Sequence, residues 1–210
     1  MKVIIIQGAG GKSFAAGADI KQLRERKMLE ALIPGMQGLY KKIEQSSKVT
    51  IAAIQGFALG GGCELALACD ICIATQKAKF GLPELNLGII PDAGGTQRLT
   101  RVVGKGRALD MVLTGKIIDG NEAERIGLIT YLADEGQLEE KAQSIAQEIM
   151  KKGPVAIKLA KLAVHKGFDI DLETAMLIEK LSQAIAFGTE DKNEGTQAFL
   201  EKRKAEFKNQ

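Results

Sequence analysis

The sequence contains no tryptophan, and aromatic residues make up only 4% of its 210 positions. Charges of the two signs nearly balance, with 29 Lys and Arg against 26 Asp and Glu and a formal net charge of +3. Proteins that bind nucleic acids typically carry a strong basic excess, or aromatic side chains on which bases stack. We therefore do not expect a nucleic acid as a partner.

Histidine and cysteine are also scarce, with His165, Cys63, Cys69 and Cys72 as the whole supply. This set does not provide the ligands of a typical zinc site, so we expect no bound metal. Three cysteines also cannot build the disulfide framework of a small secreted domain. We expect inert packing thiols in a protein of the reducing cytoplasm.

Long apolar runs are missing as well. No run reaches the roughly 18 to 20 residues that a membrane helix needs, and no basic-then-apolar leader opens the sequence. Apolar residues nevertheless make up 45% of the chain and charged residues 26%, which is the balance of a globular protein with a buried core. We expect no membrane partner.

The first 120 residues alternate short apolar runs with glycine clusters. The apolar runs predict buried strands over residues 3–6, 49–54, 70–74 and 88–90. Apolar residues at helical spacing predict helices over residues 34–45 and 104–113. This alternation indicates an α/β core over residues 1–120.

The pattern after residue 120 is almost entirely helical. It predicts helices over residues 121–126, 137–151, 155–166, 172–187 and 192–208. No low-complexity linker separates the two parts. We therefore divide the chain into the α/β core of 1–120 and a helical C-terminal region of 121–210.

A glycine cluster at residues 8–11 follows the first predicted strand, as in nucleotide-binding loops. A phosphate loop would need glycine where Ile6 stands, and the dinucleotide fingerprint would need its third glycine at Ser13. Nucleotide binding is therefore a minor alternative.

A second cluster, residues 60–62, stands just before Glu64 at the start of a predicted helix. Glycine lets a ligand approach the backbone closely, and a helix N-terminus offers free amides and a partial positive charge. Such a turn can stabilise a developing oxyanion. Taken alone, the cluster could equally be a tight turn in which Glu64 only favours the helix dipole.

Four spaced motifs resemble the enoyl-CoA hydratase/isomerase (crotonase) family. They are FAAGADI at residues 14–20, ALGGGCELA at 58–66, FGLPE at 80–84 and GGTQRL at 94–99, and further matches lie at 113–115, 123–129 and 194–203. The resemblance covers nearly the whole chain. It implies an α/β fold that is a spiral of β-β-α units, with a C-terminal helical region that serves trimerisation. The implied assembly is a homotrimer or a dimer of trimers.

The resemblance also implies an acyl-coenzyme A thioester as substrate, in a reaction of fatty acid metabolism, with no separate cofactor. Carried over by motif, the amides of Ala18 and Gly61 hold the thioester oxygen, and Glu64 and Glu84 are the catalytic carboxylates. Two amide donors can polarise a thioester carbonyl without a metal. Glu64 would position the water and Glu84 would face C2. The implied activity is the hydration of a short-chain enoyl-CoA across its 2,3 double bond.

We expect the coenzyme A moiety to contact Lys12, Ala16, Ala18, Asp19 and Ile20. Cations are frequent in this part of the chain, and phosphates favour such a surface. The cations are Lys12, Lys21, Arg24, Arg26 and Lys27. A solvated helix face explains the last three equally well.

Two departures from the family pattern keep alternatives open. Members usually carry a further segment before the strand that opens this chain, so the N-terminal part of the core would be missing. Asp92 stands where hydratases of the family usually have glycine, and the isomerases often place an acid in this loop. The alternatives are an enoyl-CoA or dienoyl-CoA isomerase that uses Asp92, or a non-catalytic member that binds coenzyme A or RNA.

Overall fold

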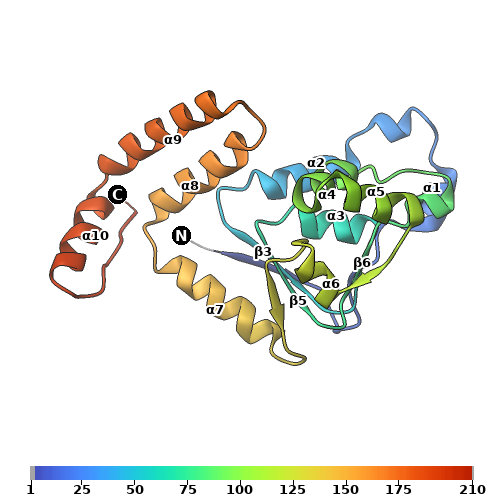
Figure 1. Cartoon of the computed structure of the whole chain (residues 1–210), viewed down its shortest axis with the longest axis horizontal. Helices are drawn as coiled ribbons and strands as arrows, with labels where there is room; N and C mark the ends of the chain where they lie inside the picture. The colour runs from blue at the N-terminus through green and yellow to red at the C-terminus, as the bar shows by residue number, and fades with distance from the viewer. Residues whose placement is uncertain (1–2, 210) are drawn as a thin grey trace. The chain divides into compact units, whose positions relative to one another are not determined.

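The computed structural model describes residues 3–209, which form two compact units (Figure 1). The core unit comprises residues 4–46 and 50–143. The helical unit comprises residues 3, 47–49 and 144–209. Within the described residues, no helix is both long and apolar enough to cross a membrane.

Two four-stranded sheets build the core unit. In the first sheet the order is β1 (Ile4–Gln7), β3 (Thr50–Ile54), β5 (Ile71–Thr75) and β8 (Tyr131–Ala133), all parallel. In the second the order is β2 (Ser13–Ala15), β4 (Phe57–Leu59), β6 (Lys79–Gly81) and β7 (Ile118–Asp119), and only β7 is antiparallel. Each of β1, β3 and β5 is followed by a strand of the second sheet and then by helix, which confirms the β-β-α spiral.

The predicted strands over residues 3–6, 49–54 and 70–74 are confirmed as β1, β3 and β5. All five residues of β3 are buried, because this strand lies inside the sheet between two parallel neighbours. The strand predicted over residues 88–90 is wrong. Gly88 has a left-handed backbone with φ of 70° and ends a short 3-10 helix, and Ile89 and Ile90 after it are exposed.

The helices of the core unit are mostly short. They are α1 (Ile20–Glu25), α2 (Gly35–Glu44), α3 (Gly61–Leu67), α4 (Gly95–Val103), α5 (Lys105–Thr114) and α6 (Gly120–Arg125), with 3-10 turns η1 (Glu30–Leu32) and η2 (Glu84–Leu87). The helices predicted over residues 34–45 and 104–113 are confirmed as α2 and α5. Helix α6 begins at Gly120, and both this helix and strand β8 belong to the core unit.

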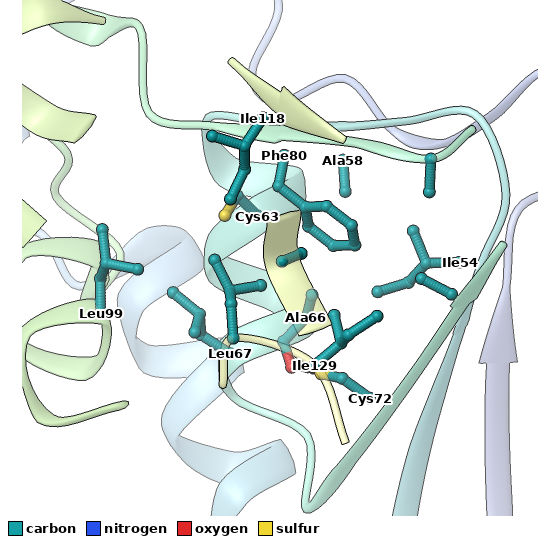
Figure 2. Close-up of a cluster of buried hydrophobic side chains, with 14 of the residues drawn as sticks. Ile54, Ala58, Cys63, Ala66, Leu67, Cys72, Phe80, Leu99, Ile118 and Ile129 are labelled. Atoms are coloured by element: carbon teal, nitrogen blue, oxygen red, sulfur yellow. Dashed lines mark hydrogen bonds between the residues drawn. The ribbon is translucent and has the colours of Figure 1, made fainter. Parts of the chain in front are cut away.

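The hydrophobic core of this unit gathers around the ring of Phe80, which is fully buried (Figure 2). The cluster contains residues from α3, α4 and both sheets, among them Ile54, Leu67 and Leu99. Cys63 and Cys72 lie in the same cluster, and burial raises the pKa of the Cys63 thiol to about 12. Both side chains therefore act as small apolar groups.

Helix α7 (Leu138–Met150) leads into the helical unit, which contains α8 (Pro154–Gly167), α9 (Leu172–Phe187) and α10 (Glu190–Leu200). The predictions over 137–151, 155–166 and 172–187 are confirmed. The helix predicted over 192–208 is wrong beyond Leu200. Lys202 has a left-handed backbone with φ of 55°, so the chain leaves the helix there.

The segment after α10 folds back onto that helix. The carboxylate of Asp191, which is buried, accepts hydrogen bonds from the amides of Lys208 and Asn209 at 2.6 and 2.9 Å. The ring of Phe207 lies 3.2 Å from the place where a Cβ on Gly195 would stand. Phe207 therefore packs on α10 rather than extending its apolar face.

Candidate active site

A pocket of about 200 Å³ in the core unit gathers most of the predicted site residues. Those that line it are Ala16, Ala18, Ile20, Gly61, Glu64, Glu84 and Asp92. Two predicted contacts of coenzyme A, Lys12 and Asp19, do not line this pocket. Lys12 is exposed, and the Asp19 side chain caps α1 by accepting a hydrogen bond from the Lys21 amide. Their role toward coenzyme A stays a prediction.

The start of α3 approaches the segment before α1 very closely. A Cβ on Gly17 would stand 3.2 Å from the amide nitrogen of Gly61, and Gly17 has φ of 88°, which favours glycine. Ala18, the next residue, therefore lies beside Gly61. Gly61 is the first residue of α3, so the geometry of the helix gives its amide no acceptor within the helix. The structure thus brings together the two amides predicted to hold the thioester oxygen.

Glu64 follows in the first turn of α3 and is only 1% exposed. One of its oxygens, Oε1, accepts hydrogen bonds from the amides of Ala93 at 2.8 Å and Gly95 at 2.7 Å. Burial raises the pKa of this carboxyl to about 7. The two amides act in the opposite direction, while the nearby charges of Glu84 and Asp92 raise the pKa further. The other oxygen, Oε2, is not held by these amides.

Glu84 begins η2 after Pro83 and lines the same pocket. Its Oε2 is buried and has no hydrogen-bond partner within residues 3–209. Burial raises the pKa of this carboxyl, and the charge of Asp92 adds to the shift. A raised pKa favours the protonated form of a carboxyl, and that form can act as a general acid. The pocket therefore holds one carboxyl bound by two amides and one with a buried oxygen that has no hydrogen-bond partner among the described residues.

Asp92 occupies the solvent side of this pocket. Its Oδ2 lies 3.5 Å from Nη1 of Arg26, and the two side chains are 53% and 30% exposed. Arg26 also donates to the carbonyl oxygens of Glu30 and Ile33. Asp92 does not cap α4, because Gly94 is the N-cap and no side chain bonds there. The carboxylate of Asp92 thus contacts Arg26, while its negative charge still raises the pKa of both glutamates.

Several contributors to the site escaped the sequence interpretation. The exposed pair Ile89 and Ile90 lines the pocket with apolar surface. The amides of Ala93 and Gly95 bind Glu64. In the sequence, the only indication of these amide donors was the pair Gly94 and Gly95 at the start of a helix. Across the described residues there is no group of three His, Cys, Asp or Glu side chains that could hold a metal ion.

Known proteins are similar to this chain over nearly its whole length. The family model described as Enoyl-CoA hydratase/isomerase matches residues 1–210. The chain belongs to the enoyl-CoA hydratase/isomerase family. A short-chain-enoyl-CoA hydratase of Clostridium acetobutylicum is 46% identical over 98% of this chain and 80% of its own length. A crotonyl-CoA hydratase of Syntrophomonas wolfei is likewise 46% identical, over 99% of this chain and 80% of its own length.

A solved structure of the enoyl-CoA hydratase/isomerase family supports the same fold. The enoyl-CoA hydratase from Bacillus anthracis superposes with a TM-score of 0.95 at 43% identity, and the match covers 100% of this chain and 82% of that one. Together with the family match, this confirms the resemblance that the four motifs indicated.

Proposed function

We propose that this protein is a short-chain enoyl-CoA hydratase, which adds water across the 2,3 double bond of an enoyl-CoA thioester. One observation carries the proposal. The amide-bound Glu64 shares a pocket with Ala18, Gly61 and Glu84, and the buried Oε2 of Glu84 has no hydrogen-bond partner among the described residues. The relatives named as hydratases of short-chain enoyl-CoA and crotonyl-CoA support it.

The amides of Ala18 and Gly61 would bind the thioester oxygen. As water attacks, negative charge moves from the double bond onto that oxygen, and amides already in place stabilise it without reorganising. Gly61 also contributes the positive end of α3. This polarisation makes C3 electrophilic and stabilises an enolate at C2.

The glutamates divide the proton transfers. Glu64 in its ionised form accepts a proton from water while the water oxygen bonds to C3. Glu84 in its protonated form then donates a proton to C2, so that one molecule of water has been added. Exchange of protons with solvent restores both carboxyls. With a pKa of about 7, Glu64 is partly ionised near neutral pH, and burial moves the pKa of Glu84 in the direction that favours its protonated form.

Isomerisation is the second candidate, because Asp92 lines the same pocket. Its carboxylate is half exposed and contacts Arg26 at the solvent side of the pocket, which supports hydration instead. Product analysis separates the two activities. The purified chain should convert crotonyl-CoA to 3-hydroxybutyryl-CoA and should move the double bond of a 3-enoyl-CoA slowly or not at all. Thioester binding without either product would instead indicate a non-catalytic member.

We also propose that the chain assembles as a homotrimer or a dimer of trimers in the cytoplasm. The support is apolar surface on the hairpin of α8 and α9, where large side chains are exposed. They include Val164, Phe168, Leu172, Met176, Leu177, Leu181 and Ile185. Light scattering at micromolar concentration should return at least a trimer, and a stable monomer would refute this assembly.

A further inference from the structure

Arg98 of α4 contacts the loop that holds Glu64. Its Nη1 donates to the carbonyl oxygen of Ala93 at 2.9 Å, while the amide of the same Ala93 donates to Glu64. The Arg98 side chain is only 15% exposed. Ala93 therefore links Arg98, which lies outside the pocket, to the carboxyl of Glu64 inside it.

Glu44, the last residue of α2, fixes the other side of the guanidinium. Nε of Arg98 donates to Oε1 of Glu44 at 2.9 Å, and Nη2 donates to Oε2 at 3.0 Å. Two parallel bonds between planar groups set the orientation as well as the distance. Tyr40, one turn earlier on α2, packs in the same buried cluster as Ala93. Helix α2 therefore supports the loop through both a polar and an apolar contact.

Two glycines of the loop leave space for these side chains. A Cβ on Gly94 would stand 2.1 Å from Nη1 of Arg98, and Gly94 has φ of 103°. A Cβ on Gly95 would stand 2.9 Å from Oε1 of Glu64. Side chains at these positions would force Arg98 or Glu64 to move. The loop therefore has glycine at both positions where a neighbouring side chain needs the space, with Arg98 beside Gly94 and Glu64 beside Gly95.

We infer that Arg98, anchored by Glu44, is a positioning residue of the hydration reaction, which holds the loop so that two amides converge on one oxygen of Glu64. The inference rests on the proposed function. Arg98 touches neither the pocket nor a reacting atom. Its effect reaches the water through the orientation of the Glu64 carboxylate.

The same bonds govern the ionisation of Glu64. The amides of Gly95 and Ala93 lower its pKa, whereas burial and the charges of Glu84 and Asp92 raise it. Two further titratable groups lie near enough for Glu64 to raise their pKa, namely Tyr40 on α2 and Cys63 on α3. A loosened loop weakens the amide bonds and should move the Glu64 pKa upward.

The experiment compares Arg98→Met, Arg98→Lys and Glu44→Gln with the parent. Arg101→Met is the matched control, because Arg101 is an exposed arginine of the same helix that bonds to the Gln97 carbonyl. Two rates are measured for each, namely hydration of crotonyl-CoA and hydrogen exchange with deuterium oxide at C2 of butyryl-CoA. The pKa of Glu64 is read separately, without substrate, by carbon-13 NMR of labelled glutamate, with Glu64→Gln to assign the signal.

We expect Arg98→Met to lower kcat for hydration roughly 10-fold to 100-fold with little change in KM, because a displaced carboxylate misorients the water. Exchange at C2 should fall less, and both the Glu64 signal and the acidic limb of the hydration profile should move to higher pH. Arg98→Lys should recover part of each change, and Glu44→Gln should produce a smaller change of the same kind. The control should match the parent.

Unchanged titration of Glu64 in the folded variants, or equal losses of hydration and exchange, would overturn the inference in favour of a structural role. If Arg98→Met does not fold, Arg98→Lys and Glu44→Gln decide by the same criteria. Failure of the proposed function is a distinct result, because the parent itself would then not hydrate crotonyl-CoA. The NMR titration would still report on Arg98.

Discussion

Glu84 reaches the pocket through space that Gly60 leaves free. A Cβ on Gly60 would stand 3.1 Å from Oε1 of Glu84, and Gly60 has φ of 55°. The same residue precedes Gly61 and, through its amide, bonds to the carbonyl oxygen of Gly81 at 2.9 Å. The turn whose Gly61 amide we propose to bind the thioester oxygen therefore also leaves the space through which Glu84, the proposed general acid, approaches.

Glu84→Gln should abolish proton transfer at C2, because the amide keeps the shape of the side chain and removes its proton. Loss of general acid catalysis should reduce the hydration rate by roughly 10² to 10⁴. Deuterium exchange at C2 should fall with it. Hydration within twofold of the parent, in a variant that circular dichroism shows to be folded, would contradict the role of Glu84.

Glu64 should make stability depend on pH. Its pKa is about 7 in the folded protein against an ordinary value of 4.5, so the folded state binds the proton more tightly than the unfolded state. The contribution is therefore complete below pH 4.5, and it is lost as pH rises from 4.5 through 7.

Glu64→Gln removes this dependence, because the amide does not titrate. The free energy of unfolding of the variant, relative to the parent, should rise across that interval by about 1 to 3 kcal/mol. Denaturant unfolding at pH 5 and pH 8 measures the change. A difference that stays constant between the two pH values would show that Glu64 ionises normally.

Much of the fold could be predicted because its buried strands are continuous apolar runs. Strand β3 is buried along its whole length, and such a run shows in the sequence. The three-residue strands β2 and β4 are too short to leave a periodic pattern. Residues 88–90 show the opposite error, in which an apolar run was interpreted as a buried strand. Ile89 and Ile90 are instead apolar because they line the pocket.

The sequence motifs named residues that the structure gathers in one pocket, such as Gly61, Glu64 and Glu84. Sequence reasoning could not find contacts between distant segments. Arg98 and Glu44 are 54 residues apart, and no local pattern joins them. The pairing of Arg26 with Asp92 spans 66 residues and is hidden in the same way. Such pairs depend on how helices and loops pack, which composition and spacing do not encode.

Gly95→Ala should damage the active site directly. The added Cβ would stand 2.9 Å from Oε1 of Glu64 and 3.0 Å from Cδ1 of Leu82, and both neighbours are fully or almost fully buried. Overpacking of this kind costs about 1 to 3 kcal/mol, and here it also pushes the carboxylate off its two amides. We expect at least a roughly tenfold loss of hydration.

Gly106→Ala is the matched control for that change. Gly106 lies in α5, and nothing stands within 4 Å of its added Cβ. Alanine in a helix is favoured over glycine by about 0.5 to 1 kcal/mol, so this variant should melt at the same or a higher temperature. Its hydration rate should equal that of the parent. Gly95→Ala with parental activity would mean that Glu64 can shift without consequence.

Asp92→Gly tests the choice between hydration and isomerisation most directly. In a hydratase, the change removes a negative charge that raises the pKa of both Glu64 and Glu84. Hydration of crotonyl-CoA should then be kept or improved, and the acidic limb of its pH profile should move to lower pH, because more Glu64 is ionised there. In an isomerase, migration of a 3-enoyl double bond should collapse.

The matched variant Asp92→Asn keeps the size of the side chain while it removes the charge. Both variants break the ion pair with Arg26, so they separate the effect of charge from that of volume. If the charge of Asp92 causes the effect, the pH profiles of hydration should shift equally in the two variants. A shift in Asp92→Gly alone would show that the space opened at the pocket causes it. Loss of 3-enoyl migration with crotonyl-CoA hydration intact would assign Asp92 to an isomerase activity in the same pocket. If neither variant alters either rate or the pH profile, the carboxylate of Asp92 is too well neutralised by Arg26 to act on the reaction.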